Sequence, residues 1–427
     1  MLPLWIGRWQ SVAKSSPTSA PFVTCKQNSC RVGPVRLAIA FDLTSLALYL
    51  AMMLLFARAL MRRRTSRTMG VARAPRASIF KPLAGYDEEL EANLESFAAV
   101  DYPSFEILIG VASLSDPALP AARRFVARHP SLDARIVVTD PNAAINPKVA
   151  QLVGLERAAN GDLYVISDSN VRVSKGYLWS LVAELADERV GMVTSLFAGT
   201  GERTLGAALE NLQLCVSSSP GLLALNAVAR RSPMVVGKSM AFRRRDLALL
   251  GGFLPVGDRL AEDYVLGQRF LRAGFELRTS LDLVENRNVS CSVARTIERH
   301  TRWSKLRRSL VPAGFAAEPM VTPIVAASLG MVAAPGPVTV TLFAFACVLQ
   351  TASAHLAVRL LRGQWLSWRY VPLEVLRSYV TFFCWLRACG SRRIEWRGHS
   401  FLLGPGSAIV PASARADRSG GRTRVAA

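Results

Sequence analysis

The stretch Asp162-Leu163-Tyr164-Val165-Ile166-Ser167-Asp168-Ser169-Asn170 predicts a buried strand over residues 163–166 that ends in a carboxylate. In open α/β sheets, ligands bind beyond the carboxyl ends of the strands. An acid placed there can hold a divalent cation, and the cation can hold a diphosphate. The competing interpretation is structural, because Asp168 or Ser169 would equally well end a strand or cap a helix that begins near Ser174. This stretch alone leaves both interpretations open.

Around this strand, the chain alternates between strand and helix patterns. Strands are predicted over residues 77–81, 106–112, 135–139, 163–167, 190–195, 240–243 and 277–283. Helices are predicted over residues 88–100, 118–128, 148–159, 175–186, 205–226 and 261–273. Leu90, Leu94 and Phe97 give the first of these helices an apolar stripe. The alternation predicts an α/β domain with a mainly parallel sheet and helices on both faces.

Apolar segments lie on both sides of this region. Residues 37–61 are apolar apart from Asp42 and Arg58, and they are long enough to span a bilayer. The basic triplet Arg62-Arg63-Arg64 follows directly and indicates a cytoplasmic end, which places the N-terminus outside. Residues 320–358 predict a transmembrane hairpin that returns to the cytoplasm.

The remaining segments are harder to place in a membrane. Residues 365–410 mix aromatic side chains with charges such as Glu374 and Arg377, which favours a segment lying in the membrane interface over a third span. Residues 1–36 are predicted to be a disordered N-terminal extension. Residues 411–427 are predicted to be a disordered basic tail.

The composition favours a membrane surface over nucleic acid. The 427 residues are 51% hydrophobic, and 52 Lys and Arg against 31 Asp and Glu give a formal charge of +21. Many arginines lie beside apolar runs, as expected at the cytoplasmic face of a membrane, and no nucleic-acid-binding motif accompanies them. The seven cysteines contain no CxxC pair and the four histidines are scattered, so no zinc or histidine-based metal site is expected.

Three short motifs place charged side chains on loops or at helix starts. Asp116, in Ser115-Asp116-Pro117, can accept hydrogen bonds from a nucleobase, although a helix start with proline explains the motif structurally. Lys148, in Ile145-Asn146-Pro147-Lys148, can meet a phosphate, although an isolated lysine is usually only solvated. Asp263, in Glu262-Asp263-Tyr264, belongs to a pair of acids that the helix dipole alone would favour.

The strongest motif is Arg299-His300-Thr301-Arg302-Trp303. Arg299 and Arg302 are spaced i, i+3 and share one helix face, from which two guanidinium groups can clamp a diphosphate. Trp303 can provide an apolar platform at a membrane surface. The structural alternative is a basic interfacial helix that is positive for lipid binding alone.

Taken in order, these motifs resemble the ceramide glucosyltransferases, with hopanoid-type lipid glycosyltransferases as close relatives. Lys81-Pro82-Leu83-Ala84-Gly85-Tyr86-Asp87, Asn93-Leu94-Glu95-Ser96-Phe97 and Asp101-Tyr102-Pro103 add to the resemblance, which runs from about Ser78 to Leu310. It implies a GT-A fold, a Rossmann-like nucleotide-diphospho-sugar transferase domain, over residues 74–310. One N-terminal and about two C-terminal transmembrane helices would flank that domain.

The resemblance also implies roles for individual residues. The implied catalytic residues are Asp116, Asp168 and Asp263, and the implied substrate-binding residues are Lys81, Lys148, Arg299, Arg302 and Trp303. Lys81 and Asp116 would lie at the uridine and ribose end, and Lys148 would line the nucleotide pocket. Asp168 would hold Mg²⁺ or Mn²⁺ on the diphosphate, and Asp263 would be the general base.

One position departs from the family pattern. Many GT-A enzymes carry Asp at both ends of a D-x-D motif, whereas this chain has Asp168 and Asn170. A neutral amide is a weaker cation ligand than a carboxylate, so a metal would rest mainly on Asp168 and the phosphates. Arg299, Arg302 and Trp303 would hold the leaving diphosphate.

The resemblance implies inverting transfer of a hexose, glucose from UDP-glucose, to the hydroxyl of ceramide. The predicted partners are a UDP-sugar donor, a membrane lipid acceptor and the membrane itself, with no nucleic acid. The expected location is a bacterial inner membrane, with the catalytic domain in the cytoplasm. The alternatives are a UDP-sugar transferase acting on a hopanoid, diacylglycerol or polyprenyl phosphate, and a membrane-anchored nucleotide-sugar binding protein without catalysis.

Overall fold

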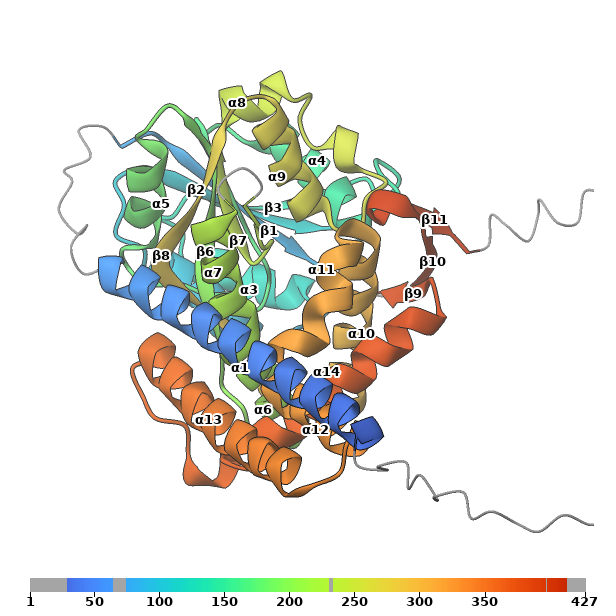
Figure 1. The fold of residues 1–427 in the computed structure, drawn as a ribbon. Helices are drawn as coiled ribbons and strands as arrows, with labels where there is room; N and C mark the ends of the chain where they lie inside the picture. The colour runs from blue at the N-terminus through green and yellow to red at the C-terminus, as the bar shows by residue number, and fades with distance from the viewer. Residues whose placement is uncertain (1–28, 64–73, 230–232, 397, 413–427) are drawn as a thin grey trace, which may run out of the picture.

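The computed structural model describes residues 29–63, 74–229, 233–396 and 398–412. It places an eight-stranded sheet with its helices beside a group of long apolar helices (Figure 1). The expectations for residues 1–28, for Arg64 and for residues 413–427 lie outside the described part of the chain.

The large sheet is mixed and has the order β3-β2-β1-β4-β7-β6-β8-β5. Its strands are β1 (Ala77–Leu83), β2 (Phe105–Val111), β3 (Ala134–Val138), β4 (Leu163–Ser167), β5 (Val171–Arg172), β6 (Val190–Thr200), β7 (Ser239–Arg243) and β8 (Glu276–Arg287). Strands β1 to β4 pair in parallel, and β8 is parallel to β6. Strand β7 runs antiparallel to both of its neighbours, β4 and β6, and β5 is antiparallel to β8. The sequence predicted a mainly parallel sheet. The antiparallel direction of β7 could not be predicted, because an apolar run of five residues does not show which way its strand runs.

Helices cover both faces of this sheet, as predicted. One face carries α2 (Leu90–Ala98), α3 (Leu119–Arg128) and α5 (Tyr177–Leu185), and the other carries α4 (Pro147–Ala158), α8 (Arg244–Leu249) and α9 (Glu262–Arg272). Adjacent strand residues point to opposite faces. In β4, Val165 joins the core that contains Phe97, and Ile166 joins the core that contains Phe242. Each such buried side chain contributes about 1.5–3 kcal/mol, so both faces of β4 are fixed by packing.

The helix predicted over residues 205–226 is interrupted. It consists of α6 (Leu205–Gln213), one π-helical turn η1 (Leu214–Ser218) and α7 (Ser219–Val228). Pro220 lies in the first turn of α7, where it lacks the N–H that a continuous helix would need. Single π-helical turns are frequent at functional sites.

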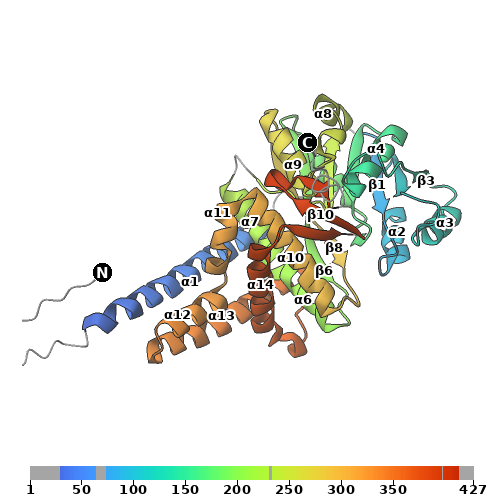
Figure 2. The ribbon, with the colours of Figure 1, turned by 90° about the vertical axis from the view of Figure 1, so that its right-hand side faces the viewer.

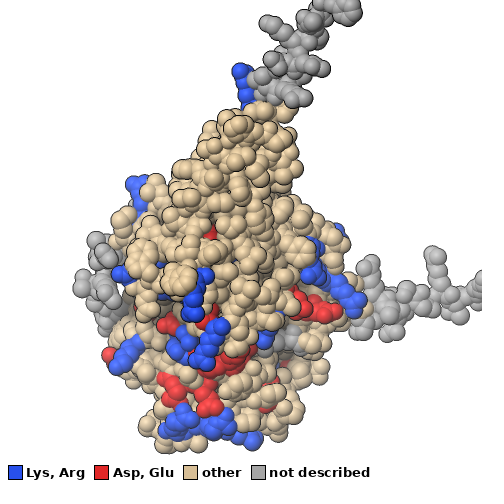
Figure 3. Space-filling view, turned by 90° about the horizontal axis from the view of Figure 1, so that it is seen from below, with Lys and Arg blue, Asp and Glu red and all other residues tan. Residues whose placement is uncertain are grey.

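Two helices are long and apolar enough to cross a membrane. They span Gly33–Met61, within α1 (Ser29–Arg63), and Pro337–Arg362, which is α13. A further pair, α11 to η3 (Pro312–Val321) and α12 (Pro323–Ala333), is bent by 77° between its two parts. Helix α1 begins before the predicted start at residue 37 and includes Pro34. Figure 2 shows α1, α12 and α13 projecting away from the sheet, and Figure 3 shows few charged side chains on the projecting part.

The segment predicted to lie in the membrane interface packs on α10 (Val293–Leu310) and on residues next to α9, and its place at a membrane interface stays a prediction. Helix α14 (Leu373–Gly390) packs along α10. Strands β9 (Arg393–Trp396), β10 (His399–Leu403) and β11 (Ile409–Pro411) form a small antiparallel sheet. Its apolar side chains, including Ile394 and Phe401, pack with Leu260, just before α9.

A third apolar core joins the long apolar helices to the large sheet. Phe56 of α1 and Val358 of α13 pack with Leu196 of β6 and Leu212 of α6, and all four side chains are buried. The position of the long helices relative to the sheet is therefore fixed by direct packing.

Candidate active site

The candidate site lies in a cavity of about 1480 Å³ that runs from the carboxyl end of β4 to the long apolar helices. Asp168, Lys238, Asp263 and Arg299 line its polar part. The apolar lining comes from α1, α7 and α12, and includes Leu48, Met52, Leu55, Leu222, Leu225 and Val325. The cavity therefore joins a charged region to an apolar region in one continuous space.

Asp168 stands at the end of β4, surrounded by lysines. Its Oδ1 lies 2.9 Å from Lys148 Nζ, and its Oδ2 lies 3.4 Å from Lys238 Nζ. Its main-chain N–H donates to the main-chain oxygen of Lys238 at 3.1 Å. Burial raises the pKa of Asp168, but Lys148 and Lys238 outweigh burial, and the net shift is downward. Asp168 is therefore a charged carboxylate held between two ammonium groups.

Lys148 is positioned by the start of α4. Asn146 caps this helix by accepting a hydrogen bond from the Lys148 N–H at 2.9 Å, and Pro147 occupies the first turn. The ammonium group of Lys148 bridges Asp168 and Glu262, whose Oε1 lies 3.0 Å away. Burial lowers the pKa of Lys148, but Asp168 and Glu262 raise it by more than burial lowers it. The lysine therefore stays charged.

Asp263 is fixed by main-chain hydrogen bonds at the start of α9. Its Oδ2 accepts from the Gly237 N–H at 2.7 Å, and its Oδ1 accepts from the Tyr264 N–H at 2.7 Å. A Cβ at Gly237 would lie 2.9 Å from Asp263 Oδ2, so this close approach needs glycine. The C-terminal sheet holds the preceding residues, because the Leu260 N–H donates to the main-chain oxygen of Ser407 at 2.9 Å.

Arg299 and His300 share one buried carboxylate. Glu210 of α6 has no solvent exposure, and its two oxygens lie 3.0 Å from Arg299 Nη1 and 3.1 Å from His300 Nε2. Burial raises the pKa of Glu210, but His300 and Arg299 lower it far more. Arg299 also donates to Asn288 Oδ1 at 3.1 Å. The His300 ring in turn packs edge-on against Trp303, with ring centroids 5.0 Å apart.

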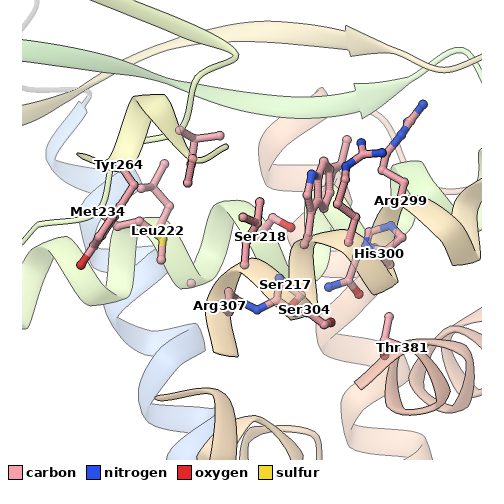
Figure 4. A pocket seen from close by; sticks show the side chains of 18 of the residues that line it. Ser217, Ser218, Leu222, Met234, Tyr264, Arg299, His300, Ser304, Arg307 and Thr381 are labelled. Carbon is pink, nitrogen blue, oxygen red and sulfur yellow. Dashed lines mark hydrogen bonds between the residues drawn. The ribbon is translucent and has the colours of Figure 1, made fainter. Parts of the chain in front are cut away.

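Arg302 and Trp303 also line the cavity. The Lys238 Nζ lies 6.0 Å from the centroid of the Trp303 ring. Figure 4 shows Arg299 and His300 of α10 at one side of the cavity and Tyr264 of α9 at the other. Ser217 and Ser218 of the π-helical turn lie between them. The i, i+3 arginine pair predicted from the sequence thus reaches the cavity, but Arg299 already has a buried carboxylate partner.

Lys81 does not line this cavity. Its side chain is fully buried, and its Nζ donates to the main-chain oxygen of Asp168 at 2.6 Å and to Ser167 Oγ at 3.3 Å. Burial lowers the pKa of Lys81 to about 7, although Asp168 and Asp87 raise it. Lys81 thus lies beneath Asp168, where it supports the strand end, and its predicted place at the uridine end stays a prediction.

Asp116 lies at the carboxyl end of β2 and does not line the cavity. Its carboxylate accepts from the Gly85 N–H at 3.1 Å and from the Ala118 N–H at 2.8 Å. Gly85 has a φ of 75°, which favours glycine. These bonds match the structural interpretation of the motif, and the nucleobase contact stays a prediction.

The residues around Asp168 determine how a cation can be held. No group of three His, Cys, Asp or Glu side chains is arranged for a metal ion in the described ranges. Asn170 donates its amide nitrogen to the main-chain oxygen of Arg287 at 3.4 Å. Mg²⁺ is often held by one or two carboxylates together with substrate phosphates. Asp168 fits such a site, in which a bound diphosphate and water supply most of the ligands.

Sequence reasoning missed three residues of the site. Gly237 and Lys238 form the loop before β7, and Glu210 lies on α6. The Gly-Lys pair directly before the strand was the one sequence feature that could have indicated this loop as part of the site. Glu210 carried no signal, because one acid in an otherwise apolar helix is usually solvent-exposed.

Comparison with known proteins supports a single family. The sequence model of glycosyl transferase family 21 matches residues 37–409. Ceramide glucosyltransferase 3 of Caenorhabditis elegans is 26% identical over 347 residues, covering 79% of this chain and 74% of that protein. Ceramide glucosyltransferase 1 of the same organism is 27% identical over 342 residues, covering 78% and 73%.

Among solved structures, a mannosyltransferase from Pyrobaculum calidifontis, in complex with GDP-Man and Mn²⁺, matches 81% of this chain and 99% of its own. Its sequence identity is 19% and its TM-score is 0.46.

The Glu210 cluster leads to a stability prediction. We expect Glu210→Gln to lower the free energy of unfolding by about 3–5 kcal/mol, because it leaves the largely buried Arg299 guanidinium without its charge partner. Thermal unfolding of the purified protein in detergent measures the change. Glu298→Gln, on the exposed side of α10, is the matched control and should leave the midpoint unchanged. Equal midpoints for both variants would contradict a structural role for the ion pairs.

Proposed function

The chain belongs to glycosyl transferase family 21, and from this premise we propose that it transfers glucose from UDP-glucose to the hydroxyl of ceramide. The product would be glucosylceramide, with inversion at the sugar carbon. The observation that carries the proposal is the single cavity that links the charged residues at the end of β4 to the apolar helices. Similarity to ceramide glucosyltransferases over more than two thirds of the chain supports the acceptor.

The polar end of the cavity suits the sugar nucleotide. Lys148, Arg302 and Trp303 line it beside Asp168, so cationic groups face the place where a diphosphate would lie. Guanidinium groups bind phosphate oxygens bidentately. Asp116 and the loop after β2 would meet the uridine, as the family pattern implies.

The apolar end suits a lipid acceptor. Leu48 and Met52 of α1 and Leu225 of α7 line the cavity on the side of the membrane helices. A lipid chain that lies along these helices would keep its hydroxyl group at the boundary with the charged region. The acceptor then reaches the site from the membrane and the donor from the aqueous side.

Asp263 is the proposed general base. Its carboxylate is half-buried, lines the cavity and is held by the Gly237 and Tyr264 N–H groups. In the transfer, Asp263 takes the proton of the acceptor hydroxyl, and the hydroxyl oxygen attacks the anomeric carbon as the bond to the diphosphate breaks. The sugar carbon develops oxocarbenium character on the way.

The leaving diphosphate gains negative charge as this bond breaks. Arg302, with Trp303 beside it, and Lys148 are the residues proposed to stabilise it, while Glu210 holds Arg299 in place. A Mg²⁺ or Mn²⁺ held by Asp168 would supply further neutralisation of the diphosphate when bound.

The proposed setting is a bacterial inner membrane with the α/β domain in the cytoplasm. The basic residues that follow the first apolar segment and those at the end of α13, Arg359 and Arg362, support this orientation.

The direct test is product formation. Membranes that contain the full chain are incubated with UDP-glucose or UDP-galactose and with ceramide, diacylglycerol or a hopanoid acceptor. We expect glucosylceramide, identified by lipid mass spectrometry, only when UDP-glucose and ceramide are both present. Product on a hopanoid or diacylglycerol alone would reassign the acceptor, and the absence of any glycolipid would reject the enzyme activity.

The base assignment leads to a second expectation. Asp263→Asn should lose turnover by on the order of 10²–10⁴, the usual share of a general base, while donor binding is kept. Initial rates give turnover, and calorimetric titration with UDP gives donor binding. Asp101→Asn, at an exposed loop position, is the matched control. Turnover of Asp263→Asn near that of the unmodified protein would contradict the assignment of Asp263 as the general base.

Cation dependence follows from the single carboxylate at Asp168. Removal of divalent metal with EDTA should weaken UDP binding by on the order of tenfold, equivalent to about 1.4 kcal/mol, and added Mn²⁺ should restore it. Titration of UDP into the full chain in detergent measures both states. Identical affinity with and without EDTA would show that the cationic side chains suffice.

A further inference from the structure

Lys238 is a cavity-lining lysine that neither the motifs nor the proposed mechanism uses. It directly precedes β7, its side chain is 14% exposed, and it faces the space beyond the end of β4. Its Nζ lies 3.4 Å from Asp168 Oδ2, which exceeds the usual range for a direct hydrogen bond. Lys238 is thus a mostly buried cation with a loosely held partner.

The other cations around Asp168 are held more tightly. Lys148 has two carboxylate partners, at 2.9 Å and 3.0 Å, and Lys81 donates to a main-chain oxygen at 2.6 Å. Arg299 has the buried Glu210. Within the described residues, Asp168 is the one carboxylate within salt-bridge distance of Lys238, and it also serves Lys148. The negative charge beside Lys238 is therefore shared.

The surroundings of Lys238 favour an additional anion. A buried ammonium with a shared counter-charge is unfavourable until an anion completes the pairing. Lys238 lines the cavity, so an anion bound there would lie beside it. The centroid of the Trp303 ring lies 6.0 Å from Lys238 Nζ, a distance at which an aromatic face attracts a cation.

We infer that Lys238 is a further diphosphate-binding residue, whose ammonium group donates charge-assisted hydrogen bonds to the diphosphate of the sugar nucleotide. In the structure the same group rests against Asp168. The inference rests on the proposed function only in taking the ligand to be a nucleoside diphosphate sugar. It adds a cationic contact that belongs to the chain itself, beside any cation held by Asp168.

The main chain of the same loop explains why this residue is well placed. The Gly237 N–H holds Asp263, and the Lys238 main-chain oxygen accepts from the Asp168 N–H. The main chain that carries Lys238 is therefore fixed relative to the proposed base. A charge-assisted hydrogen bond to phosphate is about twice as strong as a neutral one, which makes the contact measurable.

The test compares UDP with uridine as probes of the full chain in detergent, by calorimetric titration. We expect Lys238→Met to weaken UDP binding by on the order of tenfold, in Mg²⁺ and in EDTA alike, while uridine binding stays unchanged. Lys238→Arg, which keeps the charge, should recover most of the UDP affinity. Lys175→Met, at an exposed lysine, is the matched control.

Two results would overturn the inference. One is unchanged UDP affinity in Lys238→Met, and the other is an equal loss for UDP and uridine, which would indicate a general disturbance of the site. Failure of the proposed donor is a separate outcome, seen as no binding of UDP or uridine by the unmodified chain. Inorganic pyrophosphate then serves as the probe, and loss of its binding in Lys238→Met supports the inference, whereas unchanged binding overturns it.

Discussion

Two main-chain hydrogen bonds from the loop before β7 hold the acidic residues of the site in one place. The Lys238 oxygen accepts from the Asp168 N–H at 3.1 Å, and the Gly237 N–H donates to Asp263 Oδ2 at 2.7 Å. Both depend on the antiparallel insertion of β7 between β4 and β6. Without this strand, the end of β4 and the start of α9 would have no common anchor, and a base would not be fixed relative to a diphosphate site.

Helix α6 connects this polar site to the long apolar helices. Its Glu210 holds Arg299 and His300 of α10, and one turn further its Gln213 accepts a hydrogen bond from Arg377 of α14. Arg377 in turn pairs with Glu374, which accepts from Gln350 of α13 at 2.6 Å. Buried polar groups of this kind are stable only when fully paired, so each side chain fixes the next. The arginine motif and the apolar part of the cavity are thus held by one connected set of side chains.

The parts of the structure that follow from local patterns were predictable from the sequence. The strand that leads to Asp168, the layers of helices on both faces and the two long apolar helices all follow from periodicity and run length. The direction of β7, the Glu210 ion pairs and the packing of β9 to β11 on Leu260 depend on residues far apart in the chain. A short signal such as the Gly237-Lys238 pair indicates a functional role only when the fold is known to place it at the site.

Charge balance gives Asp168 a second role beyond its proposed one as a cation ligand. Its carboxylate separates Lys148 from Lys238, and its main-chain oxygen receives the buried Lys81 ammonium. Three lysines would repel one another at this distance without a shared anion. Asp168 therefore holds three lysine side chains together at the end of β4, two of which line the cavity. The amide of Asn170 binds a cation more weakly than a second carboxylate would. That weaker cation binding matters less here, because the chain itself brings positive charge to the place where the diphosphate would lie.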